Sequence, residues 1–239
     1  MNNKPRILST RTLDSSLIET ARAEGIYIEE IPFIRLAPMD DDALRDQLAG
    51  YAPKNITAVF TSSNAVREVA SFVSIPTSWT IYCIGKATQQ SVIDHFNVDR
   101  IHGTAMNARD LSKIIIKEAV QNIVFFCGDR RRDELPIALR KAGIEVEEVV
   151  VYKTMLTPSP VANKYDAILF FSPTAVESFF SMNLVTEDTL IFAVGETTAA
   201  SARQSTAAKI IIAHNPGSEE MIQLLIEHFK EPTTRTCNH

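Results

Sequence analysis

Apolar residues in this chain fall into short, nearly continuous runs that alternate with amphipathic segments. Such runs, rich in β-branched and aromatic residues, are typical of strands buried on both faces of a sheet. The segments between them, such as "SEEMIQLLIEHF", place apolar residues three and four positions apart, as helices that cover a sheet do. The alternation predicts an α/β fold with parallel sheets. The predicted strands lie in "RILST", "ITAVFTS", "TIYCIG", "NIVFFCG", "DAILFFS", "TLIFAVG" and "KIIIAH".

The chain also contains an internal repeat. Residues 58–92 align with residues 168–202 at a constant offset of 110 and without a gap. In this alignment "VFTSSNAV" matches "LFFSPTAV", and "IYCIGKATQQS" matches "IFAVGETTAAS". Shared register across two strand-turn-helix segments predicts two similar α/β units. The residues of the first copy that meet identical residues are Phe60, Ser62, Ala65, Val66, Ser71, Ile81, Gly85, Thr88 and Ser91.

Two long extended stretches, residues 26–38 and 145–158, indicate where the chain passes between these units. If both are crossing strands, each end of the chain belongs to the same domain, and residues 5–10 share a sheet with residues 166–171. A cleft between two such domains would be a favoured place for a ligand. The predicted boundaries are 1–31 with 155–239 for the first domain, 37–149 for the second, and 32–36 with 150–154 for the connection.

Composition narrows the range of functions. The 239 residues include 45% hydrophobic residues, carry a net charge of −5 and have a pI near 5.6, so nothing in the overall charge attracts nucleic acid or an anionic membrane. The chain start lacks the apolar core of a signal peptide, and no apolar run approaches the roughly 20 residues of a membrane span. We therefore expect a cytoplasmic protein without a nucleic-acid or membrane partner.

Metal and redox sites are not indicated. The cysteines Cys83, Cys127 and Cys237 form no C-x-x-C pair, and the first two lie in apolar runs typical of buried, inert thiols. Only His95 and His102 among the histidines lie within ten residues of each other, which is too weak a pattern for zinc. The chain also contains neither the spaced glycines of a dinucleotide fingerprint nor a P-loop.

Turns that follow the predicted strands carry the most promising polar residues. In open α/β sheets, ligands bind beyond the carboxyl ends of the strands. Hydroxyls in these turns serve as helix N-caps, and capping alone explains any single turn. The same N–H groups can instead hold a carboxylate, so several such turns around one cleft would suit a polyanionic ligand. The turns are Thr61-Ser62-Ser63-Asn64, Gly85-Lys86-Ala87-Thr88, Ser172-Pro173-Thr174 and Gly195-Glu196-Thr197-Thr198.

A family resemblance emerges from motifs that cover nearly the whole chain. They are "FTSSNAV", the Gly85–Thr88 turn, "FFCGDRRRDELPIALRKAGIEVEEVVVYKT", "FFSPTAVESF", "AVGETTAASA" and "HNPGSEEMIQLL". In order and spacing these motifs resemble the uroporphyrinogen-III synthase family. The resemblance implies two α/β domains joined by a two-stranded connection, and no metal or organic cofactor. It also implies hydroxymethylbilane as the substrate, which is dehydrated and cyclised with inversion of ring D through a spiro intermediate in tetrapyrrole (heme) biosynthesis.

The resemblance also assigns roles to residues. Tyr152, in "VVVYKT", matches the family's functional tyrosine and is the candidate acid, and Thr198 resembles a ligand-contacting threonine. Glu196 departs from what a carboxylate-binding turn needs, because it adds a negative charge. Two interpretations are open for the arginine run Arg130-Arg131-Arg132: it contacts the ligand, or it is a solvated helix start. The same two interpretations are open for Lys86. The candidate substrate-binding residues are Ser62, Ser63, Gly85, Lys86, Thr88, Ser172, Thr174, Gly195, Thr197 and Thr198.

A second reading belongs to a different class. The chain could be a non-catalytic, two-lobed sensor module that closes on a small anion or a tetrapyrrole and signals to a partner, because fold alone does not establish catalysis. We expect a monomer in either case. An assay with hydroxymethylbilane separates the two readings.

Overall fold

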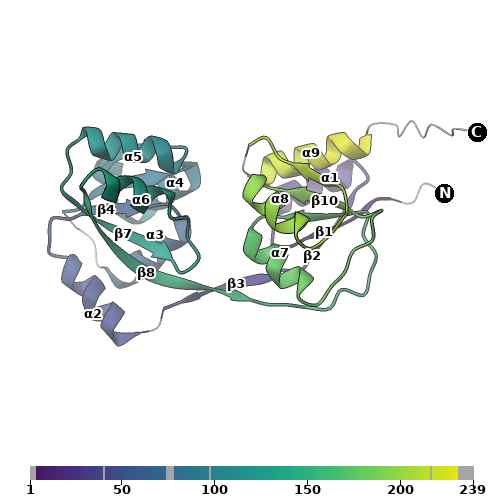
Figure 1. Ribbon diagram of the computed structural model, residues 1–239, viewed down its shortest axis with the longest axis horizontal. Coiled ribbons are helices and arrows are strands. Elements are labelled where there is room, and N and C mark those ends of the chain that lie inside the picture. The colour runs from purple at the N-terminus through teal and green to yellow at the C-terminus, as the bar shows by residue number, and fades with distance from the viewer. Residues whose placement is uncertain (1–3, 40, 74–77, 97, 216, 231–239) are drawn as a thin grey trace, which may run out of the picture. The chain divides into compact units, whose positions relative to one another are not determined.

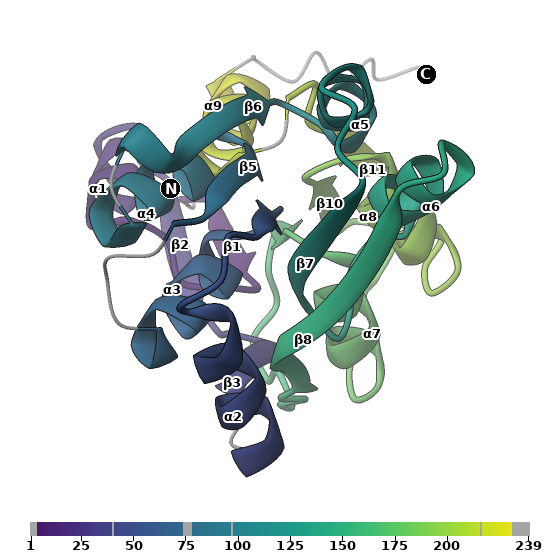
Figure 2. The same ribbon diagram turned by 90° about the vertical axis from the view of Figure 1, so that its left-hand side faces the viewer.

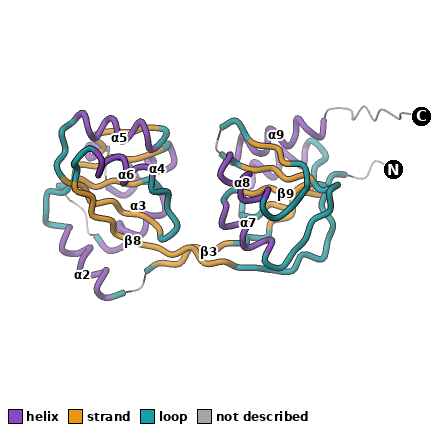
Figure 3. Tube along the Cα trace, viewed as in Figure 1, coloured by secondary structure: helices purple, strands orange, loops and turns teal. Residues whose placement is uncertain are grey.

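The computed structural model of the protein describes residues 4–39, 41–73, 78–96, 98–215 and 217–230 (Figure 1). The chain divides into two compact units: unit 1 comprises Met1–Arg35 and Met155–His239, and unit 2 comprises Leu36–Thr154. In both, helices and strands alternate along the chain (Figure 3). The chain passes from one unit to the other within β3 (Ile34–Pro38) and returns within β8 (Glu145–Leu156).

Unit 2 contains a six-stranded sheet with the order β3-β8-β7-β4-β5-β6. Side chains alternate along its strands, so Phe60 and Phe126 pack against α2, α3 and α4, whereas Val59 and Phe125 pack against α5 and α6. The sheet is therefore covered by helices on both faces (Figure 2). Its other elements are α2 (Asp42–Tyr51), β4 (Thr57–Phe60), α3 (Ser63–Phe72), β5 (Thr80–Ile84), α4 (Lys86–Phe96), a 3-10 turn (Val98–Arg100), β6 (Ile101–Ala105), α5 (Ala108–Lys117), β7 (Asn122–Gly128) and α6 (Glu134–Lys141).

Unit 1 contains a five-stranded sheet with the order β11-β10-β9-β1-β2. Its two faces are covered by α1 with α9 and by α7 with α8. Strand β1 pairs in parallel with β9, with Ile7 opposite Ala167, which confirms the prediction that residues 5–10 share a sheet with residues 166–171. The elements are β1 (Arg6–Ser9), α1 (Ser15–Ala23), β2 (Tyr27–Glu30), β9 (Ala167–Phe170), α7 (Pro173–Phe180), β10 (Leu190–Ala193), α8 (Glu196–Arg203), β11 (Ile210–Ile212) and α9 (Ser218–Lys230).

The extended stretch predicted over residues 26–38 is two strands and not one. Strand β2 ends at Glu30 and β3 begins at Ile34, and the two belong to different sheets. Pro32 lies between them and has no backbone N–H to donate to a neighbouring strand. Phe33, which is fully buried, instead packs into the core of unit 1.

The repeat predicted from the sequence is confirmed by the strand registers. In unit 2, β4 pairs with β5 so that Ala58 lies opposite Ile81, and in unit 1, β9 pairs with β10 so that Ile168 lies opposite Ile191. The same offset of 110 residues therefore relates β4 to β9 and β5 to β10. The α/β class with parallel sheets is confirmed as well, because the pairs formed among β1, β2, β9, β10 and β11 in unit 1, and among β4, β5, β6, β7 and β8 in unit 2, are all parallel.

A second offset relates the remaining strands. Strands β1 and β2 occupy the places in unit 1 that β7 and β8 occupy in unit 2, because β1 lies beside β9 as β7 lies beside β4. The segments "RAEGIYIEE" (22–30) and "RKAGIEVEE" (140–148) match accordingly, and their glycines Gly25 and Gly143 have φ of 80° and 82°. Unit 1 is thus a circular permutation of unit 2. Comparison at a single offset misses this second repeat.

Two cysteines are expected to be chemically inert in the folded protein. Cys83 and Cys127 are buried free thiols, and burial raises the pKa of both to about 11. A native Cys237→Ser variant should therefore react with an aromatic disulfide reagent at pH 8 about 100-fold more slowly than the unfolded chain, since the thiolate is the reactive form. The substitution removes the third thiol, which lies outside the described residues. Equal labelling rates in native and unfolded protein would contradict this burial.

Candidate functional site

The candidate turns gather at one edge of the sheet within each unit. Strands β4 and β5 are parallel neighbours, as are β9 and β10, so the helices that follow them begin side by side. Ser62 and Ser172 are the N-caps of α3 and α7: their hydroxyls accept hydrogen bonds from the N–H groups of Asn64 (3.2 Å) and Ala175 (3.1 Å). The capping role expected for these serines is therefore present in both units.

Residues beside the capping serines lie in the first turns of the same helices. Ser63 opens α3, and its carbonyl oxygen accepts a hydrogen bond from the hydroxyl of Ser91 at 3.4 Å. Thr174 lies in the first turn of α7. Both side chains are partly exposed, so they are accessible from solvent.

The two glycine turns differ in conformation. Gly85 has a φ of +82°, a value that favours glycine, and its N–H donates to the carbonyl oxygen of Ala105 at 2.9 Å. Gly195 has an extended backbone, with φ of 172°, and caps α8. The two turns therefore share a position in the fold without sharing a backbone shape.

The polar side chains of these turns separate into exposed and buried ones. Lys86 and Thr197 are exposed, whereas Thr88 is 5% and Thr198 is 1% exposed. The N–H of Thr198 also donates to the carbonyl oxygen of Gly195 at 3.1 Å. The two buried threonines thus lie beneath the first turns of α4 and α8, and not on their surface.

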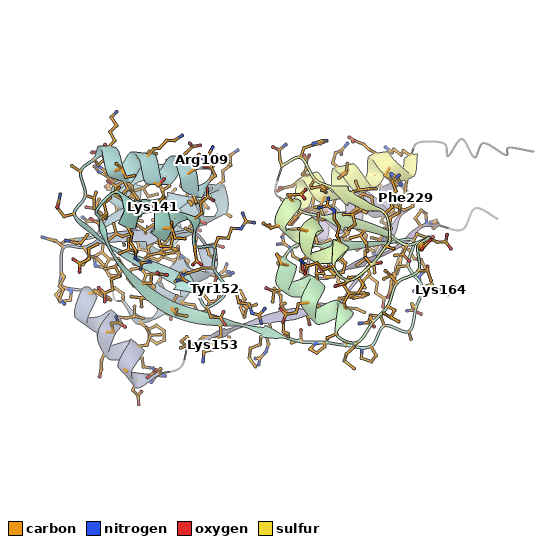
Figure 4. The ribbon with its side chains drawn as sticks, in the orientation of Figure 1. Arg109, Lys141, Tyr152, Lys153, Lys164 and Phe229 are labelled. Carbon is orange, nitrogen blue, oxygen red and sulfur yellow. The ribbon has the colours of Figure 1, made fainter. Side chains whose placement is uncertain are left out.

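Tyr152 and Ser62, which are far apart in the sequence, are in contact in the fold. Tyr152 lies on β8 beside the end of β7 (Figure 4), and its hydroxyl donates to the Ser62 hydroxyl oxygen at 3.3 Å. Burial raises the pKa of Tyr152, and the hydrogen bond to Ser62 opposes this only in part. The phenol is therefore protonated at neutral pH. The structure places a weak acid against the N-cap of α3.

Gly128, which the sequence did not single out as a site residue, makes room for Tyr152. It is the last residue of β7 and lies opposite Tyr152 in the sheet. A Cβ atom at position 128 would lie 2.5 Å from both Cε2 and Cζ of the tyrosine ring and 2.8 Å from its hydroxyl oxygen. Real Cβ atoms do not approach other atoms so closely, so the ring position requires glycine.

The three arginines of the run differ in their surroundings. Arg131 forms an ion pair with Glu148, whose other carboxylate oxygen accepts from Arg140 at 2.7 Å. Burial would raise the pKa of Glu148, but the two arginines hold it below its usual value. Arg131 therefore ties the loop after β7 to β8. Arg130 and Arg132 are exposed, and for them ligand contact stays a prediction.

Unit 1 contributes an arginine that sequence reasoning missed. Arg11 follows β1, its guanidinium lies 4.5 Å from the ring centroid of Phe171, and it donates to the hydroxyl of Ser218 at the start of α9. It therefore brings a positive charge to the edge where α7 and α9 begin. Its position directly after an apolar strand is the signal that could have identified it.

Neither a metal site nor a membrane span is found in the part of the chain that the structure describes. None of its His, Cys, Asp and Glu side chains form a group of three or more that could hold a metal ion. None of its helices is long and apolar enough to cross a membrane.

Comparison with known proteins identifies the family. A profile described as "Uroporphyrinogen-III synthase HemD" matches residues 15–223. Among solved structures, a mutant uroporphyrinogen III synthase from Thermus thermophilus is 15% identical, with a TM-score of 0.62 and coverage of 95% of this chain and 97% of that one. The synthetase from Helicobacter pylori is also 15% identical, with a TM-score of 0.62 and coverage of 94% and 99%. These likenesses show a shared fold, and the profile match over most of the chain shows that the chain belongs to the uroporphyrinogen-III synthase family.

Proposed function

We propose that this protein converts hydroxymethylbilane into uroporphyrinogen III as a dehydrating, cyclising lyase that uses neither a metal nor an organic cofactor. Loss of water from the hydroxymethyl group leaves an electrophilic azafulvene, with electrons supplied by the pyrrole nitrogen. The observation that carries this proposal is the contact of a protonated phenol, Tyr152, with Ser62 at the start of α3. Such a contact combines an acid with a turn suited to bind carboxylates.

Tyr152 is proposed to protonate the departing hydroxyl group. A general acid must hold its proton at the working pH, and burial raises the pKa of this phenol. Without substrate, the hydroxyl donates to Ser62 at 3.3 Å. When substrate binds, we propose that its hydroxyl oxygen replaces Ser62 as the acceptor, while Ser62 keeps its bond to the Asn64 N–H.

Carboxylate binding is assigned to the starts of the helices. Backbone N–H groups in a first helical turn attract anions, each such interaction being worth roughly 0.3–1 kcal/mol, and up to about 2 kcal/mol in partly buried positions. The exposed side chains of Lys86 and Thr197, and the partly exposed Ser63 and Thr174, are the proposed contacts in these turns. Thr88 and Thr198 support the same turns from beneath.

The choice of isomer is assigned to the fit between the substrate and these turns. Ring D must attack through its substituted carbon to form the spiro intermediate, which then breaks and recloses with the ring inverted. Simple head-to-tail closure gives isomer I instead. Holding the chain in one folded geometry is therefore a catalytic contribution in itself. We further propose that the protein acts as a monomer in the cytoplasm.

Incubation with hydroxymethylbilane tests the function directly. The reaction mixture is oxidised, and the isomer I and III porphyrins are separated. We expect mainly isomer III with the protein and mainly isomer I in a blank without it. If the protein binds hydroxymethylbilane but leaves the isomer ratio of the blank unchanged, the result favours the hypothesis of a non-catalytic binding module.

A further inference from the structure

We infer that Asp129 is a positioning residue that, together with a bulge in β8, aims Tyr152 at Ser62. This inference rests on the proposed acid role of Tyr152. It begins with the register of β7 and β8, in which Cys127 lies opposite Val150 but Gly128 lies opposite Tyr152. One residue of β8, Val151, is therefore inserted at this point. Bulges re-aim side chains and are rare in parallel pairs such as this one.

The inserted residue changes the face to which Tyr152 points. In a regular strand, neighbouring side chains point to opposite faces of the sheet. Val151 and Tyr152 nevertheless pack against the same cluster, beneath α2, α3 and α4, whereas Val150 packs on the opposite face. Without the bulge, Tyr152 would follow the alternation and point to the face of α5 and α6, away from Ser62. The contact between phenol and N-cap therefore depends on the bulge.

Asp129 holds this bulge with two hydrogen bonds. Its N–H donates to the carbonyl oxygen of Tyr152 at 3.1 Å, and its carboxylate accepts from the N–H of Thr154 at 2.8 Å. These bonds hold the backbone at Tyr152 and at Thr154, the residues directly before and after Lys153. The carboxylate is also close enough to Tyr152 that its charge contributes to the raised pKa of the phenol. Asp129 thus affects both the direction and the acidity of the candidate acid.

Substitution of Asp129 tests the inference. Asp129→Ala removes the acceptor for Thr154, so we expect turnover to fall by about 10–100-fold, with the KM for hydroxymethylbilane changed by less than about twofold. Asp129→Asn retains an acceptor oxygen and should restore most of the turnover. Asp94→Ala, which removes an exposed carboxylate of α4 in the same unit, is the matched control and should behave as wild type.

Two further readouts separate positioning from a merely structural role. Asp129→Asn should lower the phenol pKa, measured as the ultraviolet titration that is lost in Tyr152→Phe, because the neighbouring negative charge is gone. In a Tyr152→Phe background, Asp129→Ala should cause no further loss of turnover. Equal losses in both backgrounds, or wild-type turnover in Asp129→Ala, would overturn the inference. A wild-type protein that forms no isomer III would refute the proposed function instead, and the titration would still test the positioning.

Discussion

The Tyr152→Phe variant is expected to turn over hydroxymethylbilane about 10²–10⁴-fold more slowly than wild type, while its product remains mainly isomer III. The substitution removes the proton that the phenol would give to the departing hydroxyl. It keeps the ring, which packs against the core of unit 2, so thermal stability should change little. The rate thus reports on the acid, and the isomer ratio reports on the geometry in which the substrate is held. Single-turnover kinetics on freshly made substrate measure both.

Tyr27→Phe is the control for this experiment. Tyr27 is 48% exposed on β2, in the other unit, and its phenol should be dispensable. Circular dichroism checks that both variants are folded. Because the pyrrole nitrogen assists the departure of water, a fall of only about tenfold would still agree with an acid role. Unchanged turnover would remove Tyr152 from that role and leave positioning by the helix starts as the main source of catalysis.

Gly128→Ala is expected to cause a loss of turnover comparable with that of Tyr152→Phe, although it removes no chemical group. The added methyl would lie 2.5 Å from two ring atoms of Tyr152, so the ring must leave its position or the strand must shift. Overpacking of this kind costs about 1–3 kcal/mol of stability. Turnover is measured at a temperature well below the melting point of the variant, so that the fraction of unfolded protein does not enter the rate.

A double-mutant cycle shows whether the effect passes through the ring. In a Tyr152→Ala background the methyl at position 128 meets no ring, so Gly128→Ala should cost little more in stability or turnover. Gly50→Ala is the matched control, because Gly50 lies in α2 and a Cβ there would contact nothing within 4 Å. It should leave turnover unchanged and stability equal or slightly higher. A loss from Gly128→Ala that persists without the ring would contradict this account.

Much of the fold was predictable because it depends on local patterns. Continuous apolar runs predicted the strands, and the offset of 110 residues predicted that residues around Ser62 and Ser172 would occupy equivalent positions, which the N-caps confirm. The hydroxyls at the helix starts were also recognisable, because N-cap residues are read from a few neighbouring positions. A single offset could not reveal the permuted pair of strands. Strands β1 and β2 lie at the start of the chain, whereas their equivalents β7 and β8 lie at the end of unit 2, so a different offset relates them.

The arrangement around Tyr152 could not be predicted in the same way. The sequence predicted a tyrosine on an extended segment, but strand alternation does not reveal a bulge, because an inserted residue in β8 exists only relative to its partner β7. Nor does it reveal that Gly128 clears space for a ring 24 positions away in the chain. The pairing of Arg131 with Glu148 is of the same kind, since it depends on a loop folding back on a strand.

The sequence by itself determined the α/β class, the repeated units, the helix starts with their hydroxyls, and the resemblance that the family profile confirms. These properties depend on residues a few positions apart, where hydrophobic period and turn chemistry act. Only the tertiary structure decided that Tyr152 contacts Ser62, that Gly128 lies against the tyrosine ring and that Asp129 bonds to the backbone beside it. It also decided that Thr88 and Thr198 are buried. Burial and contact between distant residues depend on strand order and register, because these decide which side chains share a face of the sheet.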